Sequence, residues 1–71
     1  MENLKLTLAA ARVNAGMTQS ELAAKLGVSK QTVIAWERGQ RPIRPIAFHA
    51  FADAVGMPEE HLRLPLYEAA R

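Results

Sequence analysis

The sequence lacks cysteine altogether, which excludes disulfide bonds and thiolate metal sites as sources of stability. It also lacks any apolar run that approaches the roughly 18 residues of a membrane-spanning helix. Its N-terminus has no long apolar core of the signal-peptide kind, and no repeat or low-complexity stretch is present. These absences predict a soluble cytoplasmic protein that depends on a packed apolar core and has no membrane partner.

The length is that of one small domain. A chain of 71 residues buries only about 60% of the surface that its unfolded form exposes, which is close to the lower limit for folding alone. We therefore expect a single domain over residues 1–71. Within it, residues 1–6 fit an extended arm or an early helical turn, and residues 65–71 form a partly apolar tail.

Positive charge is concentrated in one part of the chain. Residues 1–45 carry seven basic and three acidic side chains, whereas residues 46–71 carry two basic and four acidic ones. Four of the basic residues fall between Lys30 and Arg44, where only Glu37 opposes them. This clustering predicts one side that faces a polyanion such as nucleic acid. The alternative interpretation is an ordinary charge imbalance on a small stable protein.

Glycine and proline residues divide the chain into five segments with helical character. Four of the segments end in a glycine, which commonly terminates a helix in the left-handed conformation. Pro45 and Pro58 suit the first turn of the last two segments, and we expect Ile46 and Phe51 to lie on a broad apolar face of the fourth. The expected helices, including the terminal glycines, cover residues 7–16, 18–27, 29–39, 45–56 and 57–64.

The second and third segments form a recognisable pair. Thr18 and Glu21 fit a capping box at the start of the second segment, in which each side chain satisfies a free backbone amide of the other. Ser29 can cap the third segment, so residues 27–29 are the whole connection. Two short helices joined by a tight turn that contains glycine form a helix-turn-helix motif. No segment alternates as a strand does, so we expect an all-α, compact five-helix domain.

The third segment has two chemically different sides. At about 100° per residue, Thr32, Val33 and Trp36 fall on one side, which we expect to pack inward. The other side mixes cationic, amide and small apolar groups, namely Lys30, Gln31, Ile34, Ala35 and Arg38. A DNA major groove, which is about 12 Å wide, admits a helix that presents such groups.

The groups on the outer side match the chemistry of base edges. Gln31 can bind adenine bidentately, Lys30 can reach guanine O6 or N7, and Ala35 can contact a thymine methyl group. Ile34 either contacts such a methyl group or is partly buried against a neighbouring helix. Arg38, near the end of the segment, is better placed for a phosphate.

The stretch MTQSELAAKLGVSKQTVIAWERGQRP, residues 17–42, resembles the helix-turn-helix of the lambda-repressor and Cro type, also called the XRE family. The flanking AARVNAG and FADAVGMPEEHL are similar to the first, fourth and fifth helices of that family, so the resemblance covers about residues 7–64. It implies a sequence-specific, double-stranded DNA-binding transcriptional regulator of the phage Cro or repressor kind. The alternative is a protein-interaction module or antitoxin component that keeps the fold with weak or absent DNA binding.

The resemblance also implies roles for individual residues. Base contacts are implied for Lys30, Gln31 and Ala35, and in many members also for Ser29 or Ile34. Phosphate contacts are implied for residues outside that helix face, namely Gln19, Arg41 and Arg44.

Each of these phosphate assignments has an alternative. Gln19 could also brace Gln31, or it could be an ordinary polar residue in a first helical turn. Arg41 and Arg44 could instead belong to a solvated basic loop. Arg12 and Glu37 are implied to form a partly buried ion pair between the first and third helices, which would make Glu37 structural.

Catalytic and metal-binding chemistry is not indicated. His49 and His61 lie on different expected helices, without a cysteine or a converging acidic cluster. We therefore predict no enzymatic activity, no cofactor, no metal and no small-molecule ligand. The predicted partner is duplex DNA, bound by a homodimer, because one module of this size contacts only a few base pairs. Candidate dimer contacts, which could alternatively complete the core, are Leu62, Leu64, Leu66 and Tyr67.

Overall fold

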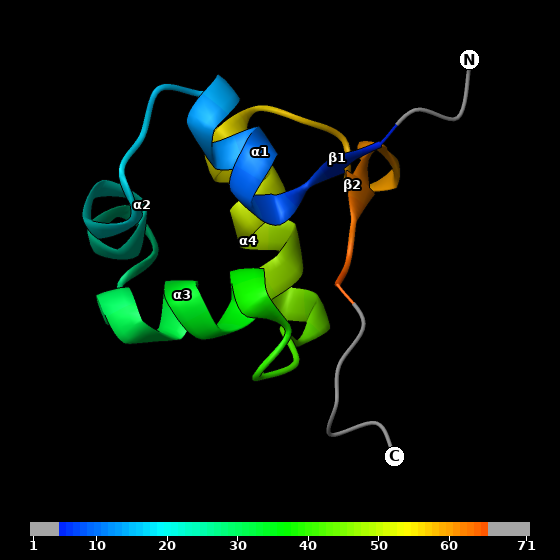
Figure 1. The fold of residues 1–71 in the computed structure, drawn as a ribbon. Helices are drawn as coiled ribbons and strands as arrows, with labels where there is room; N and C mark the ends of the chain where they lie inside the picture. Colours follow the sequence, from blue (N-terminus) through cyan, green and yellow to red (C-terminus); the bar gives the residue numbers. More distant parts are fainter. Residues whose placement is uncertain (1–4, 66–71) are drawn as a thin grey trace.

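The computed structural model describes residues 5–65, and Figure 1 shows the course of its backbone. Most of the described chain is helical. The helices are α1 (Leu8–Asn14), α2 (Gln19–Leu26), α3 (Lys30–Arg38) and α4 (Pro45–Val55), followed by a short 3-10 helix, η1 (Glu59–His61). Two very short strands, β1 (Leu6–Thr7) and β2 (Leu62–Arg63), pair in parallel as a two-stranded sheet.

The expected helical class is confirmed, but the expected count of five α-helices is wrong. The segment over residues 57–64 forms η1 and β2 instead of a fifth α-helix. Pro58 has ψ of 147°, and Leu62 returns to an extended conformation with φ of −108° and ψ of 137°. The segment therefore has room for only one helical turn before its chain becomes a strand.

The expectation that no strand occurs is also wrong, and the region expected as an arm is partly paired. Leu6 aligns with Leu62, and Thr7 aligns with Arg63. The pairing brings the beginning and the end of the described chain together on one side of the domain, as Figure 1 shows. It thereby anchors the residues that lead into α1.

The helix boundaries follow from local side-chain chemistry. Thr18 Oγ1 accepts a hydrogen bond from the backbone amide of Glu21 at 3.0 Å, and the Glu21 carboxylate accepts one from the amide of Thr18 at 2.9 Å. Ser29 Oγ accepts from the amide of Thr32 at 3.1 Å and so caps α3. Gly27 ends α2 with φ of 74°, a left-handed conformation that glycine adopts without steric cost. These caps fix the short turn between α2 and α3.

The core lies where α1, α2, α3 and α4 meet. Trp36 and Phe51 form its aromatic centre, with ring centroids 6.4 Å apart in an edge-to-face arrangement. Every described α-helix contributes buried apolar side chains, and β2 adds Leu62. The buried residues are Leu8, Ala11, Leu22, Ala23, Val33, Trp36, Ile43, Phe51, Ala52, Val55 and Leu62.

The position of α3 follows from this packing. Val33 and Trp36 anchor one of its sides in the core, while α2 packs against it across the turn. In Figure 1, α3 runs along the lower edge of the domain, and none of the other labelled elements lies below it. One side of α3 is therefore available to a partner. Within residues 5–65, the helices are too short or too polar to cross a membrane.

Candidate nucleic-acid interface

The two sides of α3 differ in the structure as the spacing of the residues predicts. Val33 is completely buried and Trp36 is 5% exposed, whereas Lys30 and Gln31 are exposed. Ile34 and Ala35 are half-buried at the margin between the two sides. From this margin, Ile34 can pack partly against a neighbouring helix and can also reach a thymine methyl group.

Ser29 is exposed, but its hydroxyl already has local partners. It caps α3 and lies 3.0 Å from the hydroxyl of Thr32. The beginning of α3 therefore presents the long side chains of Lys30 and Gln31 beside a cap that is fully engaged within the chain.

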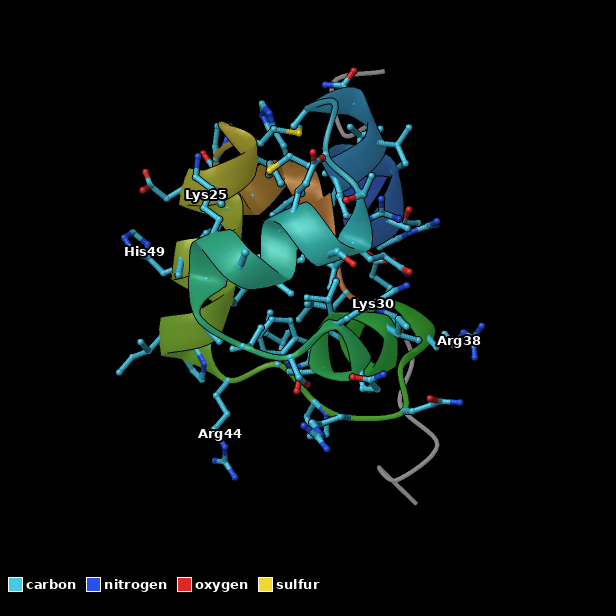
Figure 2. All side chains as sticks on the ribbon, turned by 90° about the vertical axis from the view of Figure 1, so that its left-hand side faces the viewer. Lys25, Lys30, Arg38, Arg44 and His49 are labelled. Atoms are coloured by element: carbon cyan, nitrogen blue, oxygen red, sulfur yellow. The ribbon has the colours of Figure 1, made fainter. Side chains whose placement is uncertain are left out.

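Three arginines surround the exposed side of α3. Arg38 lies in the last turn of α3, Arg41 follows it in the loop, and Arg44 precedes α4; all three are exposed. In Figure 2, Arg38 extends to the right and Arg44 extends downward from the domain, whereas Lys25 and His49 lie on the left. The basic residues at positions 38–44 are therefore grouped around α3.

The loop after α3 is tied back to that helix. The backbone amides of Gln40 and Arg41 both donate to the carbonyl oxygen of Ala35, at 2.9 and 3.3 Å. The Arg41 side chain donates through Nη1 to Thr32 Oγ1 at 3.2 Å. The Arg41 guanidinium is therefore held close to the first turn of α3 although its side chain is exposed.

The structure brings Arg12 and Glu37 into direct contact. Arg12 Nε donates to Glu37 Oε2 at 2.7 Å, and Arg12 Nη2 donates to Glu37 Oε1 at 3.3 Å. The two side chains are only 12% and 5% exposed, so the pair is largely removed from water. Arg12 Nη1 also donates to the carbonyl oxygen of Met17 at 2.9 Å. One arginine thus connects α1 to α3 and to the loop before α2.

Gln19 has a partner that sequence reasoning missed. Its side-chain nitrogen donates to Glu37 Oε1 at 3.0 Å, and within residues 5–65 the structure records no hydrogen bond between Gln19 and Gln31. The sequence gives one indication of this contact: a carboxylate that is removed from water must accept several hydrogen bonds, so a buried Glu37 would need donors besides Arg12. The side chain of Gln19 is half-buried.

The four candidate dimer residues do not form one exposed set. Leu62 is only 3% exposed and packs in the core of its own chain, because β2 pairs with β1 at that point. Leu62 is thus unavailable as a surface contact in this fold. Leu64 is 43% exposed, and Leu66 and Tyr67 lie outside the described residues. Two further exposed apolar residues, which the sequence did not indicate as dimer candidates, are Val13 and Ile46.

The two histidines remain apart from the arginine-rich side. His49 is exposed and its Nδ1 lies 2.7 Å from Glu59 Oε2, which links α4 to η1. His61 is exposed at the end of η1. Within the described part of the chain, no group of three or more His, Asp or Glu side chains is arranged to hold a metal ion.

Among the described residues, we expect the Arg12–Glu37 ion pair and the His49–Glu59 contact to differ sharply in their effect on stability, although both have a separation of 2.7 Å. Glu37→Ala would leave the Arg12 charge buried without its partner, which should lower the free energy of unfolding by about 3–5 kcal/mol. Glu59→Ala removes a partner from the more exposed pair and should change it by less than about 1 kcal/mol. Urea denaturation of both variants measures the difference. Equal losses would contradict the structural role of Glu37.

Comparisons with known proteins agree with this arrangement. A family model described as helix-turn-helix matches residues 8–62, from the beginning of α1 to the beginning of β2. The chain is 43% identical over 51 residues to an uncharacterized HTH-type transcriptional regulator of Methanothermobacter thermautotrophicus, and the match covers 72% of this chain and 71% of that protein. The chain therefore belongs to the XRE-type helix-turn-helix family, whose members are generally not enzymes.

Proposed function

We propose that this protein is a transcriptional regulator that binds double-stranded DNA in a sequence-specific manner, with α3 in the major groove. The observation that carries the proposal is the separation of charge around α3. Lys30, Arg38 and Arg44 are exposed, whereas the carboxylate of Glu37 is 5% exposed and bound to Arg12. The only acidic side chain between residues 30 and 44 is therefore turned away from the surface that would face a polyanion.

The base contacts in this proposal come from the first two turns of α3. Gln31 can donate to adenine N7 and accept from adenine N6, and Lys30 can donate to guanine O6 or N7. Ala35 is half-buried beside them, so it could contact a thymine methyl group only at the margin of the groove. Ser29 is exposed at the same end of α3, and because its hydroxyl already caps the helix and contacts Thr32, a base contact from Ser29 would use its remaining acceptor capacity.

The phosphate contacts come from the surrounding arginines. Arg38 lies at the far end of α3, and Arg41 and Arg44 lie in the loop that returns to it. Phosphate contacts fix the position of a protein on the duplex, whereas contacts to base edges give sequence preference. The assignment of these two roles to two sets of residues is what makes the proposal testable. A further support is that the similar archaeal protein is described as a transcriptional regulator.

We further propose that the protein acts as a homodimer, in the manner of Cro-like repressors. The described domain measures 34 × 33 × 19 Å along its principal axes. Dimeric helix-turn-helix proteins place their recognition helices about 34–36 Å apart, one helical turn of DNA. Two copies on successive turns would therefore lie close enough to touch. Leu64 is exposed and remains a candidate contact, together with Leu66 and Tyr67 outside the described residues.

Selection of preferred sites from a random duplex pool, followed by binding measurements over a range of salt concentrations, tests the proposed function. We expect a selected site with two-fold symmetry and half-sites one helical turn apart. Because each neutralised phosphate releases counterions, the slope of log affinity against log salt should be about −0.9 per phosphate contact. Absence of binding at low salt would contradict the proposal and would favour a protein-interaction role.

We expect Gln31→Ala and Arg44→Ala to change DNA binding in different ways. Gln31→Ala should cost about 1–3 kcal/mol on the selected site and relax the preference for one base pair, whereas Arg44→Ala should weaken binding to all sequences and reduce the salt slope by about one contact. Competition binding with single-base variants of the site measures both effects. If both substitutions weaken all sequences equally, α3 does not contact bases through Gln31.

A further inference from the structure

The hydrogen bond between Gln19 and Glu37 closes the helix-turn-helix at the side away from its turn. Gln19 is the first residue of α2, and Glu37 is the last but one residue of α3. The turn over residues 27–29 joins the other ends of the two helices. The 3.0 Å contact from Gln19 Nε2 to Glu37 Oε1 therefore connects the two helices at their ends that are most distant along the chain.

The partner of Gln19 determines which way its amide faces. Glu37 is ion-paired with Arg12, so its carboxylate oxygens only accept hydrogen bonds. The nitrogen of the Gln19 amide must face Glu37, because the carbonyl oxygen would be repelled. One of the two N–H donors of Gln19 is consequently used inside the protein.

Several hydrogen bonds fix the position of the Glu37 carboxylate, to which Gln19 donates. It accepts from Arg12 Nε and Nη2 as well as from Gln19, and its side chain is 5% exposed. Among the described residues, no buried side-chain nitrogen or oxygen lacks a hydrogen-bond partner. Loss of the Gln19 donor would leave part of this carboxylate unsatisfied, and α2 and α3 would be joined there by packing alone.

We propose that Gln19 is a positioning residue for sequence recognition: through Glu37 it fixes the angle between α2 and α3, and its side chain makes no essential phosphate contact. This inference rests on the proposed function, and it concerns how the outer side of α3 keeps its preference for one DNA sequence. Gln31 can distinguish base pairs only if α3 is held within about 0.5 Å of the productive geometry. Gln19 holds α3 in that geometry without touching a base.

The two possible roles of Gln19 give different binding signatures. A phosphate contact contributes equally on all sequences, so its loss weakens specific and non-specific binding alike and leaves their ratio unchanged. A positioning contact acts through the base-contacting residues. Its loss lowers the ratio of specific to non-specific affinity and leaves the affinity for an unrelated duplex unchanged.

The test uses Gln19→Met, which keeps an unbranched side chain of similar length and removes the amide. Ser20→Ala is the matched control, because Ser20 is exposed in the same turn of α2 and has no assigned role. Thermal unfolding first establishes that both variants are folded. Affinities for the selected site and for an unrelated duplex are then measured over a range of salt concentrations.

We expect Gln19→Met to lower the specificity ratio by about tenfold, the equivalent of about 1.4 kcal/mol, with an unchanged affinity for the unrelated duplex. Ser20→Ala should change neither quantity. We also expect Gln31→Ala to cost less specificity in the Gln19→Met background than in the wild-type chain, because a displaced α3 has already lost part of that contact. Additive effects of the two substitutions would contradict the positioning role.

Failure of this inference can be distinguished from failure of the proposed function. If the wild-type chain binds DNA, and Gln19→Met weakens binding to the selected site and to the unrelated duplex equally, Gln19 is a phosphate contact and the positioning role is wrong. If the wild-type chain shows no salt-dependent binding to any duplex, the proposed function itself fails, and the positioning role fails with it.

Discussion

The buried carboxylate of Glu37 is the interaction on which the arrangement of the first three helices depends. It accepts two hydrogen bonds from Arg12 on α1 and one from Gln19 on α2, while it projects from α3. A charge so far removed from water is tolerated only with its partners in place. Any other mutual arrangement of α1, α2 and α3 would leave this charge or that of Arg12 unpaired. The core is small and is built largely from alanine and medium-sized apolar residues. The polar contact adds to its stability and favours one arrangement of α1, α2 and α3.

The same interaction has an electrostatic consequence for the outer surface. Because Glu37 is turned inward, the exposed part of α3 and its following loop present Lys30, Arg38 and Arg44 without a neighbouring free carboxylate from the same segment. The acidic residues near the end of the described chain lie on α4 and η1, and one of them, Glu59, is paired with His49. The fold thus leaves the outer side of α3 and the loop that follows it positively charged, as binding to a polyanion requires.

Local signals predicted most of the fold, and contacts between distant segments account for what they missed. Thr18, Gly27 and Ser29 act within a few residues of their own positions, so the boundaries of α2 and α3 could be predicted from the chain. The β1–β2 pair could not, because two-residue strands carry no alternation. Ile46, expected on an apolar face, is 86% exposed, whereas Ala47 and Phe48 in the same turn of α4 pack against the core, so Ile46 lies on the side of that turn that faces away from the core. The partner of Gln19 also depends on how two helices cross, which residue spacing does not define.

The central claim is that the buried Arg12–Glu37 pair holds α3 so that its outer side, and no other surface of the domain, meets DNA. The most direct test is a titration of the ¹⁵N-labelled chain with its selected duplex, followed by nuclear magnetic resonance. We expect the largest changes at residues 29–35, at Arg38 and at residues 41–44, while the Arg12 Nε–H signal keeps its position. Largest changes on α4 and η1, or loss of the Arg12 signal on binding, would contradict it.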